Sequence, residues 1–358
     1  MAALAPPVAA VRAAVRTTLS GYGRAALVLV ACSGGADSLA LAAAAAFVAP
    51  RLGLRAGLVT VDHGLQPGSA ERAAEVAAWG ARAGLDPVEV CPVRVAGRRG
   101  GPEAAAREAR YDALLAVAHR RGAAAVLLGH TRDDQAETVL LALARGSGPR
   151  GLSGMRPRRE VDGVALLRPL LGIARSQTEQ ACAALDLAPW ADPHNADPAY
   201  ARVRVRAAAL PALVAALGPD VVDNLARTAG LLAADADCLD ALAASAGAAA
   251  TDAEGMLHVP ALRELPAALR TRVLHAWARQ HGVPGAALSH RHVAALDALV
   301  TAWRGQGPAA LPGGVTAVRR GAVLLAVHSP GRAPGRSGVP GGQPAFEQVQ
   351  CASAPAEH

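Results

Sequence analysis

The fold is decided by residues 25–41, which read AALVLVACSGGADSLAL. Leu27 to Ala31 is a short run of leucine and valine, which is typical of a parallel strand buried on both faces. Ser33 to Ser38 is small and polar, and the alanine- and leucine-rich segment after it favours a helix. A strand, a glycine-containing turn and a helix in this order direct backbone N–H groups toward an anion. The stretch therefore predicts a phosphate-binding loop.

The side chains of this loop suit a nucleotide phosphate together with a cation. Gly34 and Gly35 allow the backbone to approach a phosphate closely because they carry no Cβ. The hydroxyls of Ser33 and Ser38 can donate hydrogen bonds to its oxygens. Asp37 repels a bare phosphate, so it implies an intervening cation such as Mg²⁺. A plain strand-to-helix turn with Ser38 as N-cap is the alternative, but it leaves Ser33, one glycine and Asp37 unexplained.

Strands and helices alternate through the rest of the first 150 residues. This alternation predicts an α/β fold with a doubly wound, Rossmann-like parallel sheet, in which ligands bind at the carboxyl ends of the strands. The expected strands are Leu27–Ala31, Arg55–Val61, Pro87–Val93 and Ala124–Gly129, and the expected helices are residues 8–20, Ser69–Ala83 with Ser69 as N-cap, Pro102–Arg121 and Asp133–Arg145.

Polar residues follow two further strands, and we expect them to converge with the loop at one edge of the sheet. Asp62 and His63 follow the second strand, and His130 follows the fourth. Asp134 and Glu137 are three residues apart and share a face of the next helix, whose N-cap is Thr131 or Asp133. Two carboxylates with a histidine can hold Mg²⁺ or grip an amino group. Acidic residues also favour a first helical turn simply because they complement its dipole.

Two other segments have both a functional and a plain structural interpretation. Glu103, Arg107 and Arg110 lie on one helix face, either as a surface salt-bridge ladder or with an arginine against phosphate or nucleic acid. Residues 145–155 are glycine-rich and cationic. They form either an ordinary linker or a flexible loop that closes over a substrate.

The composition narrows the class of protein. All 36 basic residues are arginines, which excludes the ordinary P-loop because its motif requires a lysine. The net charge of +7 suits a polyanionic partner, although an arginine-rich proteome would shift many proteins in this way. The five cysteines lack Cys-x-x-Cys spacing, which argues against a disulfide framework and against a zinc or iron–sulfur site. With no signal peptide pattern and no apolar run of membrane-spanning length, we expect a cytoplasmic protein without membrane association.

The motifs together resemble a known family. Residues 33–38 match the Ser-Gly-Gly-x-Asp-Ser pattern of the PP-loop ATP pyrophosphatases, which cleave ATP between its α and β phosphates. Taken in order, the motifs resemble the tRNA(Ile)-lysidine synthetase family from about residue 25 to 215, and more loosely to about 327. The other motifs are VDHGL (61–65), EAAAREARY (103–111), GHTRDDQAET (129–138) and RGSGPRGLSGM (145–155), extended by residues 168–171 and 190–197.

The resemblance implies a two-step reaction on an isoleucine tRNA with a CAU anticodon. ATP adenylates the ring carbonyl of the wobble cytidine, and the ε-amine of free L-lysine then attacks that carbon and releases AMP. The resemblance implies that ATP is contacted by Ser33, Gly34, Gly35, Ala36, Asp37 and Ser38, and that Asp37 also binds Mg²⁺. It places His63 and Arg110 near the base and the α-phosphate, so that the implied catalytic residues are Asp37, His63, Arg110 and His130. It assigns the lysine pocket to His130, Asp134, Glu137, Arg202 and Arg206. Val203 and Val205 replace the asparagine and isoleucine that are usual between those two arginines.

Four parts are expected along the chain. They are an N-terminal helix (1–24), a PP-loop catalytic domain (25–218), a smaller α+β tRNA-binding domain (219–328) and a disordered tail rich in proline, glycine and serine (329–358). In the smaller domain we expect helices at Asp220–Ala246, Leu262–His281 and His290–Trp303, a strand at Met256–Val259 and a hairpin at Gly313–Val327. We expect tRNA contacts from its arginines, although each of them could equally be a solvated charge. These arginines are Arg270, Arg272, Arg279, Arg291, Arg304, Arg319 and Arg320.

Two alternatives remain open at this point. A PP-loop tRNA thiolase also adenylates a ring carbonyl but uses sulfur as the nucleophile, and Cys32 abuts the loop. A buried cysteine at a strand end is, however, more often a packing residue. A catalytically silent tRNA-binding paralogue is the second alternative, against which the presence of Asp37, Asp134 and Glu137 argues. The oligomeric state is also open, with a homodimer as one option.

Overall fold

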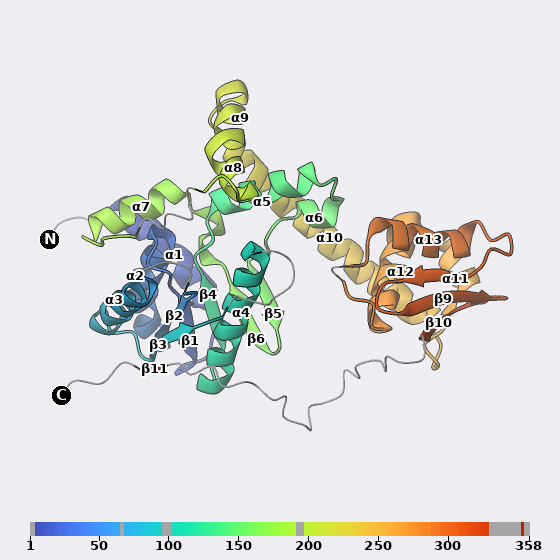
Figure 1. Cartoon of the computed structure of the whole chain (residues 1–358), viewed down its shortest axis with the longest axis horizontal. Coiled ribbons are helices and arrows are strands. Elements are labelled where there is room, and N and C mark those ends of the chain that lie inside the picture. The colour runs from blue at the N-terminus through green and yellow to red at the C-terminus, as the bar shows by residue number, and fades with distance from the viewer. Residues whose placement is uncertain are drawn as a thin grey trace. The chain divides into compact units, whose positions relative to one another are not determined.

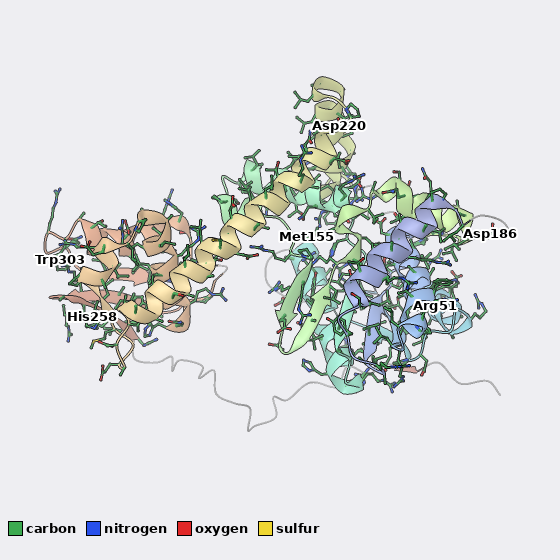
Figure 2. The ribbon with its side chains drawn as sticks, turned by 180° about the vertical axis from the view of Figure 1, so that it is seen from behind. Arg51, Met155, Asp186, Asp220, His258 and Trp303 are labelled. Carbon is green, nitrogen blue, oxygen red and sulfur yellow. The ribbon has the colours of Figure 1, made fainter. Side chains whose placement is uncertain are left out.

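The computed structural model describes residues 4–64, 68–94, 102–190, 197–285, 287–328 and 352–353. It consists of two compact units, one formed by residues 1–233 and 345–358 and the other by residues 234–344 (Figure 1). The units divide within one long helix, α10 (Val221–Ala250). Figure 2 shows the side chains from behind, with Arg51 and Asp186 labelled in the first unit and His258 and Trp303 in the second. The functional boundary at 218/219 stays a prediction.

The first unit is built around a seven-stranded sheet with the order β11-β3-β2-β1-β4-β6-β5. The five central strands are parallel, and the two edge strands run antiparallel to their neighbours. This confirms the predicted doubly wound parallel sheet. The strands are β1 (Leu27–Ala31), β2 (Arg55–Asp62), β3 (Val88–Pro92), β4 (Ala125–Leu128), β5 (Arg158–Val161), β6 (Val164–Leu167) and β11 (Ala352–Ser353).

Helices cover both faces of this sheet because alternate residues of its strands point to opposite sides. Val28 and Val30 of β1 belong to a core shared with α1, α2 and α7, whereas Leu27 and Leu29 belong to a core shared with α4. The helices of this unit are α1 (Pro6–Leu19), α2 (Ala36–Arg51), α3 (Ser69–Arg82), α4 (Pro102–Arg121), α5 (Arg132–Ala144), α6 (Pro149–Leu152), the 3-10 helix η1 (Pro169–Gly172), α7 (Arg175–Ala184), α8 (Ala201–Arg204), the π-helix η3 (Val205–Ala209), α9 (Leu210–Leu217) and the first part of α10.

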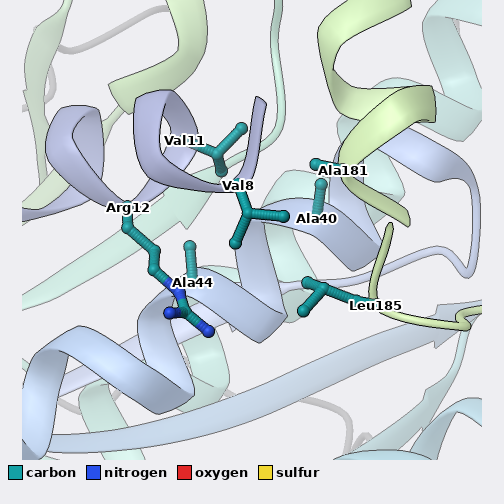
Figure 3. A pocket seen from close by; sticks show the side chains of 7 residues that line it. All are labelled: Val8, Val11, Arg12, Ala40, Ala44, Ala181 and Leu185. Carbon is teal, nitrogen blue, oxygen red and sulfur yellow. The ribbon is translucent and has the colours of Figure 1, made fainter. Parts of the chain in front are cut away.

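The contact between α1, α2 and α7 is made by small apolar side chains (Figure 3). Val8 and Val11 of α1 face alanines of α2 and the end of α7, and the hollow between them has no space for a water molecule. Arg12 lies beside it, with its guanidinium carbon 3.5 Å from the ring centre of Phe47. We therefore interpret this hollow as helix packing and not as a binding site.

The direction of the chain through the sheet fixes where a ligand can bind. From β1 the chain continues to β2 and β3 on one side and reaches β4 and β6 on the other. Ligands of such sheets bind in the crevice at this reversal of strand order, outside the carboxyl ends of the strands. The segment Ser33–Ser38 follows β1, and Gly129 and His130 follow β4, so both meet at that crevice.

The structure of the first unit differs from the sequence prediction in a hairpin, a helix and an N-cap. The hairpin of β5 and β6 and the helix α7 were not predicted. The hairpin turn is Asp162-Gly163, with φ of +48° and +79°, and an Asp-Gly pair is a known hairpin signal although here only β6 is an apolar run. The predicted N-cap Ser69 is wrong. Gly68, in the left-handed region at φ +80°, occupies the cap position, and Ser69 is the first helical residue.

The second unit packs α11 (Val259–Glu264), α12 (Ala267–Gln280) and α13 (His290–Thr301) against a four-stranded sheet of order β7-β10-β9-β8. The predicted single helix Leu262–His281 is wrong, because Pro266 lacks an N–H and stands at the N-cap of α12. The predicted hairpin is confirmed as β9 and β10. The strands are β7 (Leu257–His258), β8 (Ala309–Leu311), β9 (Val315–Arg320) and β10 (Val323–His328).

The cysteines and the tail complete the comparison. Cys32, Cys182 and Cys238 are free, whereas Cys91 in β3 is disulfide-bonded. Apart from β11, the predicted disordered tail (329–358) lies outside the described residues.

Candidate active site

The loop after β1 is held by its own serines. Ser38 Oγ accepts a hydrogen bond from the Ser33 N–H (3.2 Å) and donates one to the Gly35 carbonyl (2.9 Å). The N-cap of α2 is Gly35, so the alternative role of Ser38 as N-cap is not the one observed. No side chain caps this helix N-terminus, which leaves its first N–H groups available to an anion.

Gly34 shows why the loop needs a residue without a side chain. Its φ is +85°, in the left-handed region, and a Cβ there would stand 2.9 Å from Val76 Cγ2. The Gly34 carbonyl accepts a hydrogen bond from the Trp190 N–H at 2.9 Å. The loop is thus packed at Gly34 against α3 and Trp190, while Ser33, Gly35 and Asp37 line the cleft described below.

A cleft of about 810 Å³ opens at this crevice. Its volume lies within the range of small-molecule sites. Most of the predicted site residues line it. They are Ser33, Gly35, Ala36, Asp37, Ser38, His63, Arg110, His130, Asp134, Arg202 and Arg206; Gly34 and Glu137 do not line it.

Asp37 is the loop carboxylate that faces the cleft. Burial raises its pKa to about 6, against the opposing effects of a hydrogen bond from Thr178 and the charge of Arg175. Thr178 Oγ1 donates to one carboxylate oxygen, and Arg175 Nε lies 3.6 Å from the other. Asp37 is therefore largely ionised at neutral pH and remains partly accessible, with 24% of its side chain exposed.

Thr131 and Asp134 together cap α5, which resolves the open choice between Thr131 and Asp133. The Thr131 N–H donates to Asp134 Oδ2 at 2.8 Å, and the Thr131 side chain accepts from the Asp134 N–H in a capping box. Burial alone would raise the pKa of Asp134, but Arg175 and the Thr131 N–H hold it below its usual value. Asp134 is thus a fixed negative charge at the edge of the cleft.

Glu137 is fully buried behind the cleft and is surrounded by three arginines. Its carboxylate lies 3.3 Å from Arg175 Nη1, 3.0 Å from Arg202 Nε and 2.7 Å from Arg206 Nε. Arg202 and Arg206 come from α8 and η3, far along the chain, and Arg202 also donates to Thr138 Oγ1 at 2.8 Å. The five predicted lysine-pocket residues are therefore brought together, with Glu137 as the anchor of the arginines.

His130 and Arg110 both line the cleft, and the charge of Arg110 contributes to the lowered pKa of His130. The pKa of His130 is lowered to about 3, chiefly by burial and also by the charges of Arg110 and Arg168, against the opposing charge of Asp134. Its Nδ1 is buried and has no hydrogen-bond partner among the described residues. Burial also lowers the pKa of Arg110, whose guanidinium lies 5.6 Å from the ring centre of Tyr111. His63 lines the same cleft at the end of β2.

The sequence patterns did not single out Arg72 and Arg175, which line this cleft, or Thr178, which contacts Asp37. Arg175 and Thr178, in the first turn of α7, contact Asp37, while Arg72 of α3 lies over the ring of Trp190 with its guanidinium carbon 5.3 Å from the ring centre. Arg175 follows the short 3-10 helix η1 and is the first residue of α7. Only a correct prediction of α7 would therefore have placed Arg175 at the start of a helix. No chemical motif in the sequence marks it.

The residues fit a nucleotide triphosphate and, in part, a divalent cation. The uncapped N-terminus of α2 and the Ser33 and Ser38 hydroxyls suit phosphate oxygens. Asp37 presents a single carboxylate, which agrees with the way Mg²⁺ uses one or two carboxylates together with substrate phosphates. Among the described residues no group of three or more His, Cys, Asp or Glu side chains is placed to hold a metal ion.

Comparison with known proteins identifies the family. The chain matches the PP-loop domain family over residues 11–213 and the TilS substrate binding domain family over residues 257–323. The protein named tRNA(Ile)-lysidine synthase from Salinispora tropica is 66% identical over 313 residues, which cover 87% of this chain and 94% of that one. The protein of that name from Thermobifida fusca is 56% identical over 308 residues, or 86% and 94% of the two chains. The chain belongs to the tRNA(Ile)-lysidine synthase family.

Membership in the tRNA(Ile)-lysidine synthase family confirms the resemblance drawn from the motifs, and the PP-loop match assigns ATP as the nucleotide. A solved structure, the U34-tRNA thiolase NcsA from Methanococcus maripaludis with its [4Fe-4S] cluster, is similar with a TM-score of 0.52 and 18% identity over 63% of this chain and 80% of that one. At this identity the likeness shows the PP-loop fold alone.

The helices were also compared with the dimensions of a membrane. In the described parts of the chain, no single helix has the length and apolar character to span a bilayer. Residues 201–217 and 221–250, bent by 100° at their junction, pass the length and composition test only as a pair.

Proposed function

We propose that this member of the tRNA(Ile)-lysidine synthase family joins free L-lysine to the wobble cytidine of an isoleucine tRNA with a CAU anticodon. In the first step the ring carbonyl oxygen attacks the α-phosphate of ATP, and diphosphate leaves. In the second step the lysine ε-amine bonds to the ring carbon, AMP leaves with the former carbonyl oxygen, and the amine loses a proton. The proposal rests on one observation above all: a phosphate-binding loop and a carboxylate–arginine cluster share one cleft.

The first step draws on the loop and the residues beside it. The N-terminus of α2 and the serine hydroxyls bind phosphate oxygens, and Arg110 faces the same cleft as a cation for the developing charge. Asp37 would hold Mg²⁺, which supplies charge neutralisation at the phosphates when it is bound. His130 stays uncharged at neutral pH because its pKa is about 3, so it can contact the base or the amine without adding positive charge.

The second step draws on the carboxylates at the edge of the cleft. Asp134 remains ionised and lines the cleft, so it suits an ammonium group of lysine. Glu137 supports it indirectly by holding Arg202 and Arg206, which line the cleft and suit the lysine carboxylate. The amine must lose a proton before or during attack, because the charged form has no lone pair.

The cysteines argue against the sulfur-transfer alternative. Cys32 and Cys182 line the cleft, and burial raises the pKa of both thiols, that of Cys182 to about 11. The thiolate is the nucleophile in sulfur chemistry, so neither thiol is activated at neutral pH. The silent-paralogue alternative conflicts with an ionised Asp37 that faces the cleft.

A single assay tests the proposed function. The protein is incubated with ATP, Mg²⁺, labelled lysine and an isoleucine tRNA transcript that carries a CAU anticodon, and the label in the tRNA is counted. We expect ATP-dependent incorporation, and no incorporation by Asp37→Asn. A folded wild-type protein that leaves the tRNA unlabelled would contradict the proposal. Because ATP, lysine and tRNA are all cytoplasmic substrates, the reaction would take place in the cytoplasm.

A further inference from the structure

Arg175 is the first residue of α7, and its side chain reaches three carboxylates at once. Its Nε lies 3.6 Å from Asp37 Oδ2, its Nη2 lies 3.0 Å from Asp134 Oδ1, and its Nη1 lies 3.3 Å from Glu137 Oε1. It also lines the cleft, with 20% of its side chain exposed. One guanidinium therefore joins the aspartate of the ATP loop to both members of the acidic pair.

The backbone of Arg175 is tied to the same groups. Its N–H donates to Asp133 Oδ2 at 2.8 Å, and its carbonyl oxygen lies 2.7 Å from Thr178 Oγ1. The Thr178 hydroxyl is also within hydrogen-bond reach of Asp37. The first turn of α7 is thus held in place by side chains of α2 and α5.

The carboxylates of the cluster already lie against guanidinium groups before an ammonium group arrives. Three carboxylates, of Asp37, Asp134 and Glu137, face three guanidinium groups, which belong to Arg175, Arg202 and Arg206. A lysine ammonium that approached Asp134 would meet the guanidinium of Arg175 already 3.0 Å from that carboxylate. Since like charges repel strongly in a partly buried site, the amine can bind well only after Arg175 turns away.

We propose that Arg175 is a positioning residue that withholds Asp134 from lysine until ATP binds. This inference rests on the proposed function. Phosphates bound at the loop would place negative charge next to Asp37, where the Arg175 Nε already lies. The guanidinium then turns toward the phosphates, and Asp134, which lines the cleft, becomes free for the ammonium group. By linkage, lysine must in turn raise the affinity for the nucleotide by the same factor.

Equilibrium dialysis of labelled lysine measures this coupling directly. The wild-type protein is dialysed in magnesium buffer with and without a non-hydrolysable α,β-methylene analogue of ATP. We expect the analogue to tighten lysine binding by roughly 5- to 100-fold, the range typical of coupled sites. In Arg175→Met, lysine should bind more tightly than to the nucleotide-free wild type, and the analogue should change its affinity less than about twofold.

Three comparisons keep this test specific. Arg175→Lys retains a positive charge but contacts fewer carboxylates, so it should restore part of the coupling. Arg132→Met removes an ion pair in which Arg132 Nη1 lies 2.7 Å from Asp223 Oδ2. Neither residue lines the cleft, so this variant should leave the coupling between nucleotide and lysine unchanged. Thermal unfolding of each variant checks that the fold is retained.

The outcomes separate this inference from the proposed function. If wild-type protein incorporates lysine into tRNA but the analogue leaves lysine affinity unchanged, the role assigned to Arg175 is wrong and the function stands. The role of Arg175 is equally wrong if Arg175→Met retains the wild-type coupling. If the wild type binds no lysine under any condition and incorporates none, the function itself is wrong.

Discussion

Asp37 is the residue whose chemistry the structure defines most sharply. An aspartate has an ordinary pKa of about 4, and burial raises that of Asp37 to about 6. Because the protonated form persists to higher pH than usual and cannot hold a cation, ATP use should be lost in weak acid. We expect kcat/KM for ATP, which reports the free enzyme, to fall about tenfold per pH unit below pH 6.

The hydrogen bond from Thr178 provides a control for this assignment. That bond lowers the pKa of Asp37, so Thr178→Val should raise the pKa and move the acid limb of the kcat/KM profile to higher pH. A profile that stays flat to pH 5 in the wild type, or that does not move in Thr178→Val, would show that Asp37 does not control ATP use.

The residues that sequence patterns could identify are those with a motif of their own. The loop serines, Asp37 and the histidines follow predictable strand ends, so the sheet topology gathers them. Arg175 could not be found in this way, because its role depends on how α7 packs against α5, a tertiary contact that leaves no local signal. The sequence also could not reveal that Glu137 is buried behind its arginines.

At the scale of elements, the approach of β4 to α2 is set by Gly129. A Cβ at Gly129 would lie 3.2 Å from the backbone carbonyl carbon and oxygen of Asp37. Gly129→Ala should therefore push the loop and α2 away from β4, at a stability cost of about 1–3 kcal/mol. A misplaced loop should lower kcat/KM for ATP by about 10- to 100-fold.

Gly172→Ala is the matched control, because nothing lies within 4 Å of a Cβ there. Steady-state kinetics and chemical denaturation of the two variants make the comparison. If Gly129→Ala kept wild-type ATP kinetics, the tight packing of the loop against β4 would not matter for function.

The helices and strands were predictable where the apolar pattern of the sequence was long or had clear ends. β1 and α4 have the predicted bounds because an apolar run and a long helical pattern define them. The hairpin of β5 and β6 was missed although Asp162-Gly163 marks its turn, since its strands have only four residues each. The break between α11 and α12 was missed because the apolar periodicity continues through Pro266.

At the scale of the whole molecule, we expect the excess positive charge to bind tRNA phosphates through exposed arginines rather than through those that form ion pairs within the protein. Arg291 and Arg304 are exposed, whereas Arg270 and Arg272 lie 2.6 and 3.0 Å from Asp297 and Asp240. We expect Arg291→Ala and Arg304→Ala to weaken tRNA binding. Each phosphate that a variant no longer neutralises should reduce the slope of log K against log salt by about one.

Arg272→Ala should instead lower thermal stability, because it leaves Asp240 without this partner. Fluorescence titration of tRNA at several salt concentrations, alongside thermal unfolding, distinguishes the two classes. Equal effects of all three variants on tRNA binding and none on stability would contradict this division of the arginines.

The central claim is that the loop around Asp37 drives adenylation of a tRNA base before lysine is joined to it. Trapping the intermediate tests this most directly. The protein is incubated with isoleucine tRNA, Mg²⁺ and ATP labelled in the α-phosphate, and label that stays with the tRNA is measured before and after lysine is added. We predict that the tRNA carries AMP in the absence of lysine and releases it when lysine arrives. A tRNA that never carries the label, while lysine is nevertheless incorporated, would contradict the account.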